Sequence, residues 1–229
     1  MKGILISIEG TDGAGKHTQQ QLLQDHLINL KHKVYDCSFP NYESDSSAPV
    51  KMYLSGEFGD TANCLDAYEA STLYATDRLC TYKKQIKPHY DKGEIILLDR
   101  YVQSNFIHQC SKINDEVERE KFLNWVQEFE FDILHLPRPD LVFFIEMPVE
   151  KSIELAKARE NYKTGEQKDI HEEDTSYMTK SYNNGLSLAK KFNWTLIHCL
   201  DDDGNLKTKE EIHNEIMEIT LNFLKSKNQ

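Results

Sequence analysis

The residues best suited to chemistry lie close to the N-terminus, where residues 10–16 fit the pattern G-x-x-x-x-G-K. Gly10, Gly13 and Gly15 are free to adopt backbone angles that other residues avoid, which lets successive amide N–H groups turn toward one anion. Lys16 adds a full positive charge. This combination predicts a loop that holds the phosphates of a nucleotide. The expected phosphate contacts are Gly10, Thr11, Gly13, Ala14, Gly15, Lys16, His17 and Thr18.

The loop departs from its usual pattern at one position that bears on metal binding. The residue after the lysine is normally Ser or Thr, whose hydroxyl ligates the magnesium of the nucleotide, but His17 stands there and Thr18 comes one place later. A carboxylate ligand is expected at the end of a buried strand, and Asp99 follows the apolar run 95–98. The sequence therefore predicts Mg²⁺ held by Asp99 and Thr18, with water and the nucleotide's own oxygens.

Short apolar runs alternate with segments of helical periodicity along the chain. The strands and helices that they predict must position the phosphate loop and the metal ligands. Strands are expected at residues 3–8, 33–38, 94–98, 140–145 and 195–199. Near-continuous apolar strands between helices predict an α/β fold, with a five-stranded parallel sheet and helices on both faces. Helical spacing of leucines predicts a helix from Thr18 to Leu30, whose N-terminus would direct its partial positive charge at the bound phosphate. A closing helix is expected at 207–225.

Polar and aromatic side chains follow several of these strands. Asp12, Phe39, Asp99 and Glu146 each come just after a predicted strand. Ligands of parallel α/β sheets bind beyond the carboxyl ends of the strands. We therefore expect these residues along one edge of the sheet, around the bound ligand.

Composition narrows the class of protein. A chain of 229 residues suits a single domain, expected over 1–229, and the charged segment 159–174 without apolar periodicity is expected to form a lid within it. The formal net charge of −11 argues against a nucleic acid polymer or a membrane surface as partner. No apolar run approaches the length of a membrane span. Five cysteines without paired spacing suit a reducing cytosol, so we expect buried thiols in a cytoplasmic protein.

Four further motifs resemble those of the thymidylate kinases, a family of P-loop nucleoside monophosphate kinases. They are D-R-Y-x-x-S-N at 99–105, Phe-Pro-Asn-Tyr at 39–42, Tyr-Ala-Thr-Asp-Arg at 74–78 and Leu-Pro-Arg-Pro-Asp-Leu at 136–141. Their order and spacing match the family over nearly the whole chain. The resemblance implies transfer of the γ-phosphoryl group of ATP to dTMP, giving dTDP and ADP in dTTP synthesis. It also implies a homodimer whose partners are the small-molecule substrates dTMP and ATP.

The resemblance also implies a role for each matching residue. Lys16 would hold the donor's β and γ phosphates, Arg100 would clamp the acceptor phosphate, and Asp12 would face the 3′-hydroxyl of the deoxyribose. Around the base, Tyr74 would stack on thymine, Arg78 would donate to O4 and Asn105 would read N3. The expected substrate contacts are Asp12, Phe39, Tyr42, Tyr74, Arg78, Arg100, Ser104, Asn105 and His108.

Among the positions that differ from the family pattern, two bear on substrate choice and catalysis. His108 stands where relatives usually carry an aromatic ring against C2′ of the sugar and could hydrogen-bond a 2′-hydroxyl, which predicts weaker rejection of the ribonucleotide than of dCMP. Gly13 stands where some branches carry an arginine that supplies catalytic charge from the phosphate loop. That charge would then come from the lid, with Arg159 as the expected catalytic residue and Lys163 and Lys168 as further candidates. The expected catalytic set is Asp12, Lys16, Arg100 and Arg159.

Alternative functions remain open on the sequence alone. A deoxynucleoside kinase would need a carboxylate base for a neutral hydroxyl, and Glu9 or Asp12 could serve. A nucleotide-binding regulator without turnover is suggested by His17. Single residues also have structural interpretations: Asp77 and Arg78 as an exposed helical pair, Tyr74 as a core aromatic, and Arg100 as a strand-end ion pair.

Overall fold

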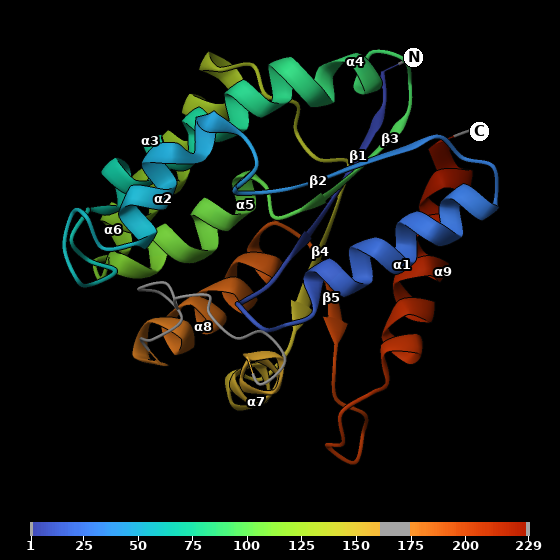
Figure 1. Ribbon diagram of the computed structural model, residues 1–229. Coiled ribbons are helices and arrows are strands. Elements are labelled where there is room, and N and C mark those ends of the chain that lie inside the picture. Colours follow the sequence, from blue (N-terminus) through green and yellow to red (C-terminus); the bar gives the residue numbers. More distant parts are fainter. Residues whose placement is uncertain (1, 161–174, 228–229) are drawn as a thin grey trace.

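A five-stranded parallel sheet forms the centre of the computed structural model, which describes residues 2–160 and 175–227 (Figure 1). The strand order is β2-β3-β1-β4-β5. The strands are β1 Ile4–Glu9, β2 Val34–Ser38, β3 Ile95–Asp99, β4 Leu141–Glu146 and β5 Thr195–His198. All five predicted strands and their parallel arrangement are confirmed, with ends that differ by at most one residue from those expected.

Alternate residues of a strand point to opposite faces of the sheet. Both faces are therefore apolar, because the buried strands are near-continuous apolar runs. On β1, Ile6 and Ile8 pack with Leu23 and Leu27 of the first helix and with the C-terminal helix. Leu5, which precedes them on the same strand, belongs to the core on the other face. Covering both faces leaves the carboxyl edge of the sheet as the place where polar groups gather.

Helices α1 and α9 cover one face, and α3, α6 and α8 cover the other (Figure 1). The α-helices are α1 Lys16–Asn29, α2 Ala48–Leu54, α3 Ala67–Thr81, α4 Lys87–Tyr90, α5 Val102–Ser104, α6 Glu116–Gln127, α7 Val149–Glu160, α8 Thr175–Lys191 and α9 Lys209–Lys227. The helix predicted from Thr18 begins two residues earlier, so Lys16 is its first residue. The predicted closing helix is confirmed as α9.

Three helices continue into widened turns of π-helix. These segments are η2 Tyr82–Ile86, η3 Asn105–Gln109 and η5 Glu128–Ile133. Short 3₁₀ turns, η1 Asp45–Ser47 and η4 Cys110–Lys112, complete the connections. π turns inside helices often occur at functional sites, and two of these carry residues that the next subsection brings together.

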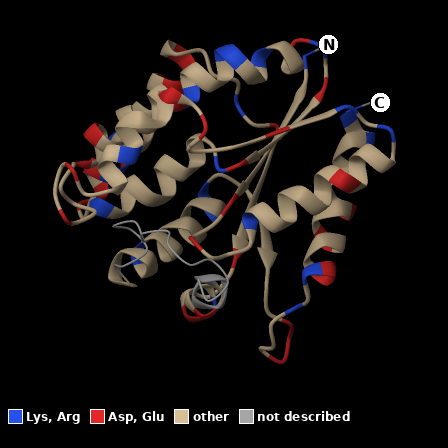
Figure 2. Cartoon of the chain, viewed as in Figure 1, with Lys and Arg blue, Asp and Glu red and all other residues tan. Residues whose placement is uncertain are grey.

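The distribution of charged residues and the exposure of the cysteines can be compared with what the composition predicts. Over the described residues, positions of Lys and Arg are interspersed with positions of Asp and Glu along the outer helices (Figure 2). The helices of the described part include none long and apolar enough to cross a membrane. Cys110 and Cys199 are buried as expected, but the prediction is wrong for Cys80, which is exposed because its position on α3 faces away from the core.

Candidate active site

The glycine-rich loop joins β1 to α1 at the carboxyl edge of the sheet. Gly10, Gly13 and Gly15 have φ angles of 152°, 78° and 85°, in the region that favours glycine. Gly15 caps α1, and no side chain caps the helix there. The first amide groups of α1 therefore stay available to an anion, and the helix dipole favours negative charge at the same point.

The side chain of Lys16 is folded back into this loop. It is buried, and Nζ donates a hydrogen bond of 2.8 Å to the carbonyl oxygen of Thr11. Burial, together with the nearby positive charge of Arg100, lowers the pKa of Lys16 to about 8. Phosphate oxygens in the loop would oppose both effects, so the site favours an anion beside this ammonium group.

The predicted metal ligands lie at the end of β3 and the start of α1. Oδ1 of Asp99 is buried and finds no hydrogen-bond partner among the described residues, while Oδ2 lies 4.0 Å from Nδ1 of His17. An unpartnered buried carboxylate oxygen fits a ligand that supplies a cation or a water. The described residues hold no cluster of three His, Cys, Asp or Glu side chains suited to a metal. A metal here would therefore take most of its ligands from nucleotide and water.

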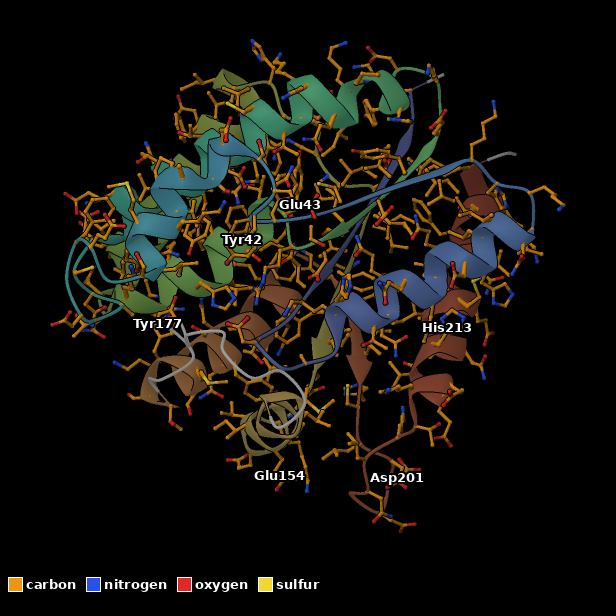
Figure 3. The ribbon with its side chains drawn as sticks, in the orientation of Figure 1. Tyr42, Glu43, Glu154, Tyr177, Asp201 and His213 are labelled. Carbon is orange, nitrogen blue, oxygen red and sulfur yellow. The ribbon has the colours of Figure 1, made fainter. Side chains whose placement is uncertain are left out.

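A cavity opens beside the loop, at the carboxyl ends of β1, β2 and β3. It contains about 530 Å³ of empty space. Its lining residues are Asp12, Phe39, Pro40, Tyr42, Leu54, Tyr74, Arg78, Arg100, Ser104, Asn105, His108, Gln109 and Tyr177. All nine predicted substrate contacts are in this set, although they come from four separate parts of the chain. Tyr177 of this lining comes from the start of α8, and Tyr42 comes from the loop after β2 (Figure 3).

Arg100 is the hub of the end of the cavity nearest the phosphate loop. Nη2 donates to Asp12 at 2.5 Å, and Nη1 lies 2.8 Å from Nε2 of His108 and 3.3 Å from Oγ of Ser104. The residue has a left-handed φ of 67°, held by a bond from its amide to the carbonyl of Ile8. Burial disfavours its charge, but Asp12, Asp99 and Glu9 more than offset this and raise the pKa of Arg100 above its ordinary value. The guanidinium of Arg100 therefore stays positively charged in the wall of the cavity.

The other end of the cavity carries a buried polar group of three residues. Arg78 and Asn105 line the cavity, and both reach a carboxylate behind it, that of Glu130. Nε and Nη2 of Arg78 each donate to it at 2.6 Å, and Nδ2 of Asn105 donates at 2.9 Å. Tyr74 lines the same end and packs edge-on against Tyr53. The structural interpretation of Asp77 and Arg78 as an exposed pair is wrong, since both are almost fully buried.

Asp77 instead holds the segment after β2 against the cavity. Its carboxylate accepts bonds from the amide of Asn41 at 2.8 Å and from Oγ of Ser46 at 2.6 Å. These bonds fix the loop that carries Phe39 and Tyr42 over the cavity. Phe39 is buried, whereas half of Tyr42 remains exposed.

The sequence analysis did not identify Glu130 or Tyr177 as site residues, and two of its predictions concern parts of the chain that lie outside the described residues. Glu130 lies between two phenylalanines in the segment E-F-E-F, and an acid flanked by aromatic residues is a weak sign of a buried carboxylate. Tyr177 carries no comparable signal. The predicted lid at 159–174 has residues 161–174 outside the described part of the chain, and so has the side chain of the predicted catalytic Arg159.

A second hollow lies at the carboxyl ends of β4 and β5. Its lining residues are Glu146, Pro148, Tyr182, His198, Cys199, Leu200, Asp201, Asp202 and Lys207. The phosphate loop adjoins this part of the sheet, because a Cβ atom at Gly10 would lie 3.1 Å from the carbonyl oxygen of Ile145 on β4. The loop thus lies between two hollows along one edge of the sheet.

Comparisons with known proteins agree with this geometry. The sequence profile described as thymidylate kinase matches residues 8–216. The thymidylate kinase of Mycobacterium tuberculosis (strain CDC 1551 / Oshkosh) is 31% identical over 78% of this chain and 82% of its own length. The thymidylate kinase of Thermoanaerobacter sp. (strain X514) is 25% identical over 98% of this chain and its full length. A solved thymidylate kinase from Candida albicans, described as having broad substrate specificity, shares the fold, with a TM-score of 0.69 and 23% identity over 95% of this chain and 91% of its own.

Proposed function

Because this chain belongs to the thymidylate kinase family and is a dTMP-phosphorylating enzyme, we propose how its residues divide the reaction ATP + dTMP → ADP + dTDP. The observation that carries the proposal is the pairing of a phosphate loop with an adjoining cavity whose far end combines Tyr74, Arg78 and Asn105. The cavity takes dTMP and the loop takes the phosphates of ATP. The transferred group then passes between them at the position of Arg100.

The acceptor enters with its phosphate toward Arg100 and its base toward Arg78. A bidentate guanidinium suits the anionic oxygens of a monophosphate. In the free enzyme Arg100 is paired with Asp12, so the incoming phosphate takes over part of this pairing. The carboxylate of Asp12 then accepts a hydrogen bond from the 3′-hydroxyl of the deoxyribose.

The donor phosphates occupy the loop and the start of α1. Lys16 leaves the carbonyl of Thr11 and pairs with the β and γ phosphates, where its charge offsets the negative charge of the transferring group. We assign the nucleoside of ATP to the hollow at the ends of β4 and β5, because that hollow adjoins the loop on the side opposite the acceptor cavity. In phosphoryl transfer of this kind, positioning and charge neutralisation supply most of the catalysis.

Magnesium is the metal that this donor set fits. The buried, unpartnered Oδ1 of Asp99 would hold the ion, directly or through water, and Thr18 remains the proposed hydroxyl ligand. When bound, Mg²⁺ neutralises phosphate charge and orients the γ-phosphoryl group. His17 has its side chain largely exposed beside Asp99, so it occupies the outer side of the same site.

The position of Glu9 favours the kinase of a monophosphate over a kinase of a free nucleoside. A neutral hydroxyl acceptor needs a carboxylate base, whereas a monophosphate is already ionised. Glu9 is fully buried, and its two oxygens accept bonds from the amide of Tyr101 and from Oγ of Ser104. Asp12 is engaged by Arg100. Both carboxylates therefore have structural partners in the places where a nucleoside kinase would need a free base.

A coupled ADP-release assay with dTMP, dCMP, dGMP and thymidine tests the proposal. The expected result is turnover with dTMP, only trace turnover with dCMP, and none above background with dGMP or thymidine. Turnover with thymidine would instead make the protein a deoxynucleoside kinase. Nucleotide binding without turnover would make it a regulator, and Lys16→Ala serves as the inactive reference in each case.

We further propose that the enzyme works as a homodimer in the cytoplasm. The dimer is supported by the family resemblance, and the compartment by five cysteines that are all free thiols in the structure. Sedimentation at micromolar concentration tests the first point, where a mass near 26.7 kDa would contradict it. Fluorescent tagging in cells tests the second.

A further inference from the structure

We propose that Glu130, which no catalytic role requires, is a positioning residue that sets the hydrogen-bond polarity of the base pocket and thereby its selection of thymine over cytosine. This inference rests on the proposed function, since it concerns how the acceptor cavity reads its base. Glu130 lies in the π turn η5 that ends α6, is completely buried, and stands behind Arg78 and Asn105 as seen from the cavity.

The carboxylate fixes the guanidinium of Arg78 through two parallel bonds. Nε donates to Oε2 and Nη2 donates to Oε1, both at 2.6 Å. Such paired bonds set the plane of the guanidinium as well as its position. They use the N–H of Nε and one N–H of Nη2, so the donors left for a ligand are the second N–H of Nη2 and the two of Nη1. Arg78 therefore presents an N–H group to the cavity in one orientation.

The same carboxylate decides which way the Asn105 amide faces. An ionised carboxylate only accepts hydrogen bonds, so the amide must turn its NH₂ group toward it. Nδ2 of Asn105 does donate to Oε1 of Glu130 at 2.9 Å, and to the carbonyl of Ser71 at 3.4 Å. With Nδ2 held on that side, Oδ1 is the atom left for a base. One buried charge thus gives the pocket a donor at Arg78 next to an acceptor at Asn105.

This donor and acceptor pair matches one class of pyrimidine. Thymine and uracil present an acceptor, O4, beside a donor, N3–H, which is the complement of Arg78 and Asn105. Cytosine presents an amino donor beside an acceptor nitrogen, which is the reverse. A reversed base would leave buried polar groups unpaired, and sites built on hydrogen bonds discriminate strongly for that reason.

A purely structural ion pair would not require the contact with Asn105. Buried pairs lose the hydration of both charges, so they are weak evidence of stabilisation. Here the third bond, to the amide, connects the pair to a residue of the cavity wall. The position of both partners on that wall distinguishes this group from an ordinary core ion pair.

The test compares Glu130→Gln with the parent in steady-state assays using dTMP and dCMP. A glutamine keeps the shape but places an NH₂ group against either Arg78 or Asn105, so the Asn105 amide is no longer held in one orientation. We expect the ratio of kcat/KM for dTMP over dCMP to fall about 10–100-fold. Glu128→Gln makes the same change at an exposed position in the same π turn and should keep the parent ratio.

The ratio separates positioning from loss of folded protein. A variant that merely folds poorly loses activity toward both nucleotides in parallel and keeps the ratio, which would overturn the inference. The KM for ATP should stay unchanged, because Glu130 lies away from the phosphate loop. If Glu130→Gln gives no folded protein by circular dichroism, Glu130→Asp takes its place in the test. Aspartate keeps the charge but draws the carboxylate away from Asn105. An unchanged ratio in Glu130→Asp would overturn the inference. A parent enzyme that does not phosphorylate dTMP would overturn the proposed function instead.

Discussion

Glu9 should make the stability of the protein fall as the pH rises toward neutrality. It ends β1, is completely buried, and accepts a bond of 2.8 Å from the amide of Tyr101 and one of 2.7 Å from Oγ of Ser104. Burial raises its pKa from 4.5 to about 7, although the Ser104 bond and the charge of Arg100 act in the other direction. The folded protein therefore holds a proton that the unfolded chain has already released in this pH range.

The sign and size of the effect follow from that difference. Because the pKa is higher in the folded state, the stabilisation is fully present below about pH 4.5 and is lost as the pH rises through about 7. Each pH unit in this window is worth about 1.4 kcal/mol, so the total loss is about 3 kcal/mol. Roughly 2 kcal/mol of this loss falls between about pH 5.5 and pH 8, above the sequence pI of about 5.3.

Urea unfolding followed by circular dichroism measures it, with Glu9→Gln as the comparison. Glutamine cannot ionise, and its amide can still accept from Tyr101 and donate to the hydroxyl of Ser104. The free energy of unfolding of the variant should gain about 2 kcal/mol on the parent across that range. Glu43→Gln, at an exposed position (Figure 3), should follow the parent. Parallel curves for parent and Glu9→Gln would refute the reasoning, because they would mean that Glu9 is ionised throughout.

Four further outcomes are expected. Lys16→Ala should lower kcat by at least about 10²–10³-fold with an unchanged circular dichroism spectrum, whereas Lys31→Ala, just beyond the far end of α1, should not; a Lys16→Ala variant that kept half the parent activity would contradict the assignment of the loop to the donor phosphates. By kcat/KM, dCMP should be rejected by about 10⁴, and dUMP should be used about 10–200-fold less well than dTMP, since it lacks only a methyl group; equal use of dTMP and dCMP would contradict the assignment of the base pocket. His108→Phe removes the nitrogen that pairs with Arg100 and should raise the KM for dTMP about 5–10-fold while improving rejection of the ribonucleotide; an unchanged KM would separate His108 from the phosphate clamp. Gly185→Ala forces a methyl group into the ring of Phe144 and should cost about 1–3 kcal/mol in urea unfolding, whereas Ser187→Ala on the exposed side of α8 should cost little; equal stabilities would contradict that contact.

The parts of the fold set by local pattern were predictable from the sequence. Each strand is an apolar run between turn residues, and each ends close to where its run ends, so Asp99 and Phe39 could be placed at the carboxyl edge without coordinates. The phosphate loop was equally accessible, because its glycines answer a local backbone requirement. The resemblance then supplied the cavity residues, and all nine lie together.

What could not be predicted depends on contacts between distant segments. Glu130 is 52 positions from Arg78 and 25 from Asn105, and no periodicity marks a pairing that three separate helices create. The π turns that carry Asn105 and Glu130 also continue ordinary α-helices, and the sequence pattern does not mark where the helix widens. The same limit explains the error at Cys80, because its exposure depends on which face of α3 the remainder of the chain covers.

The close packing of Gly13 restricts how this enzyme can evolve. Gly13 has a φ of 78°, and a Cβ atom there would lie 2.5 Å from the backbone carbonyl oxygen of Ser152 in α7. Branches of the family that supply catalytic charge from an arginine at this loop position therefore use a solution that a single substitution cannot introduce here, since the arginine would first have to displace a helix. The two arrangements are separated by a coordinated change in loop and helix, because the atom in the way is a backbone oxygen that no substitution at position 152 removes.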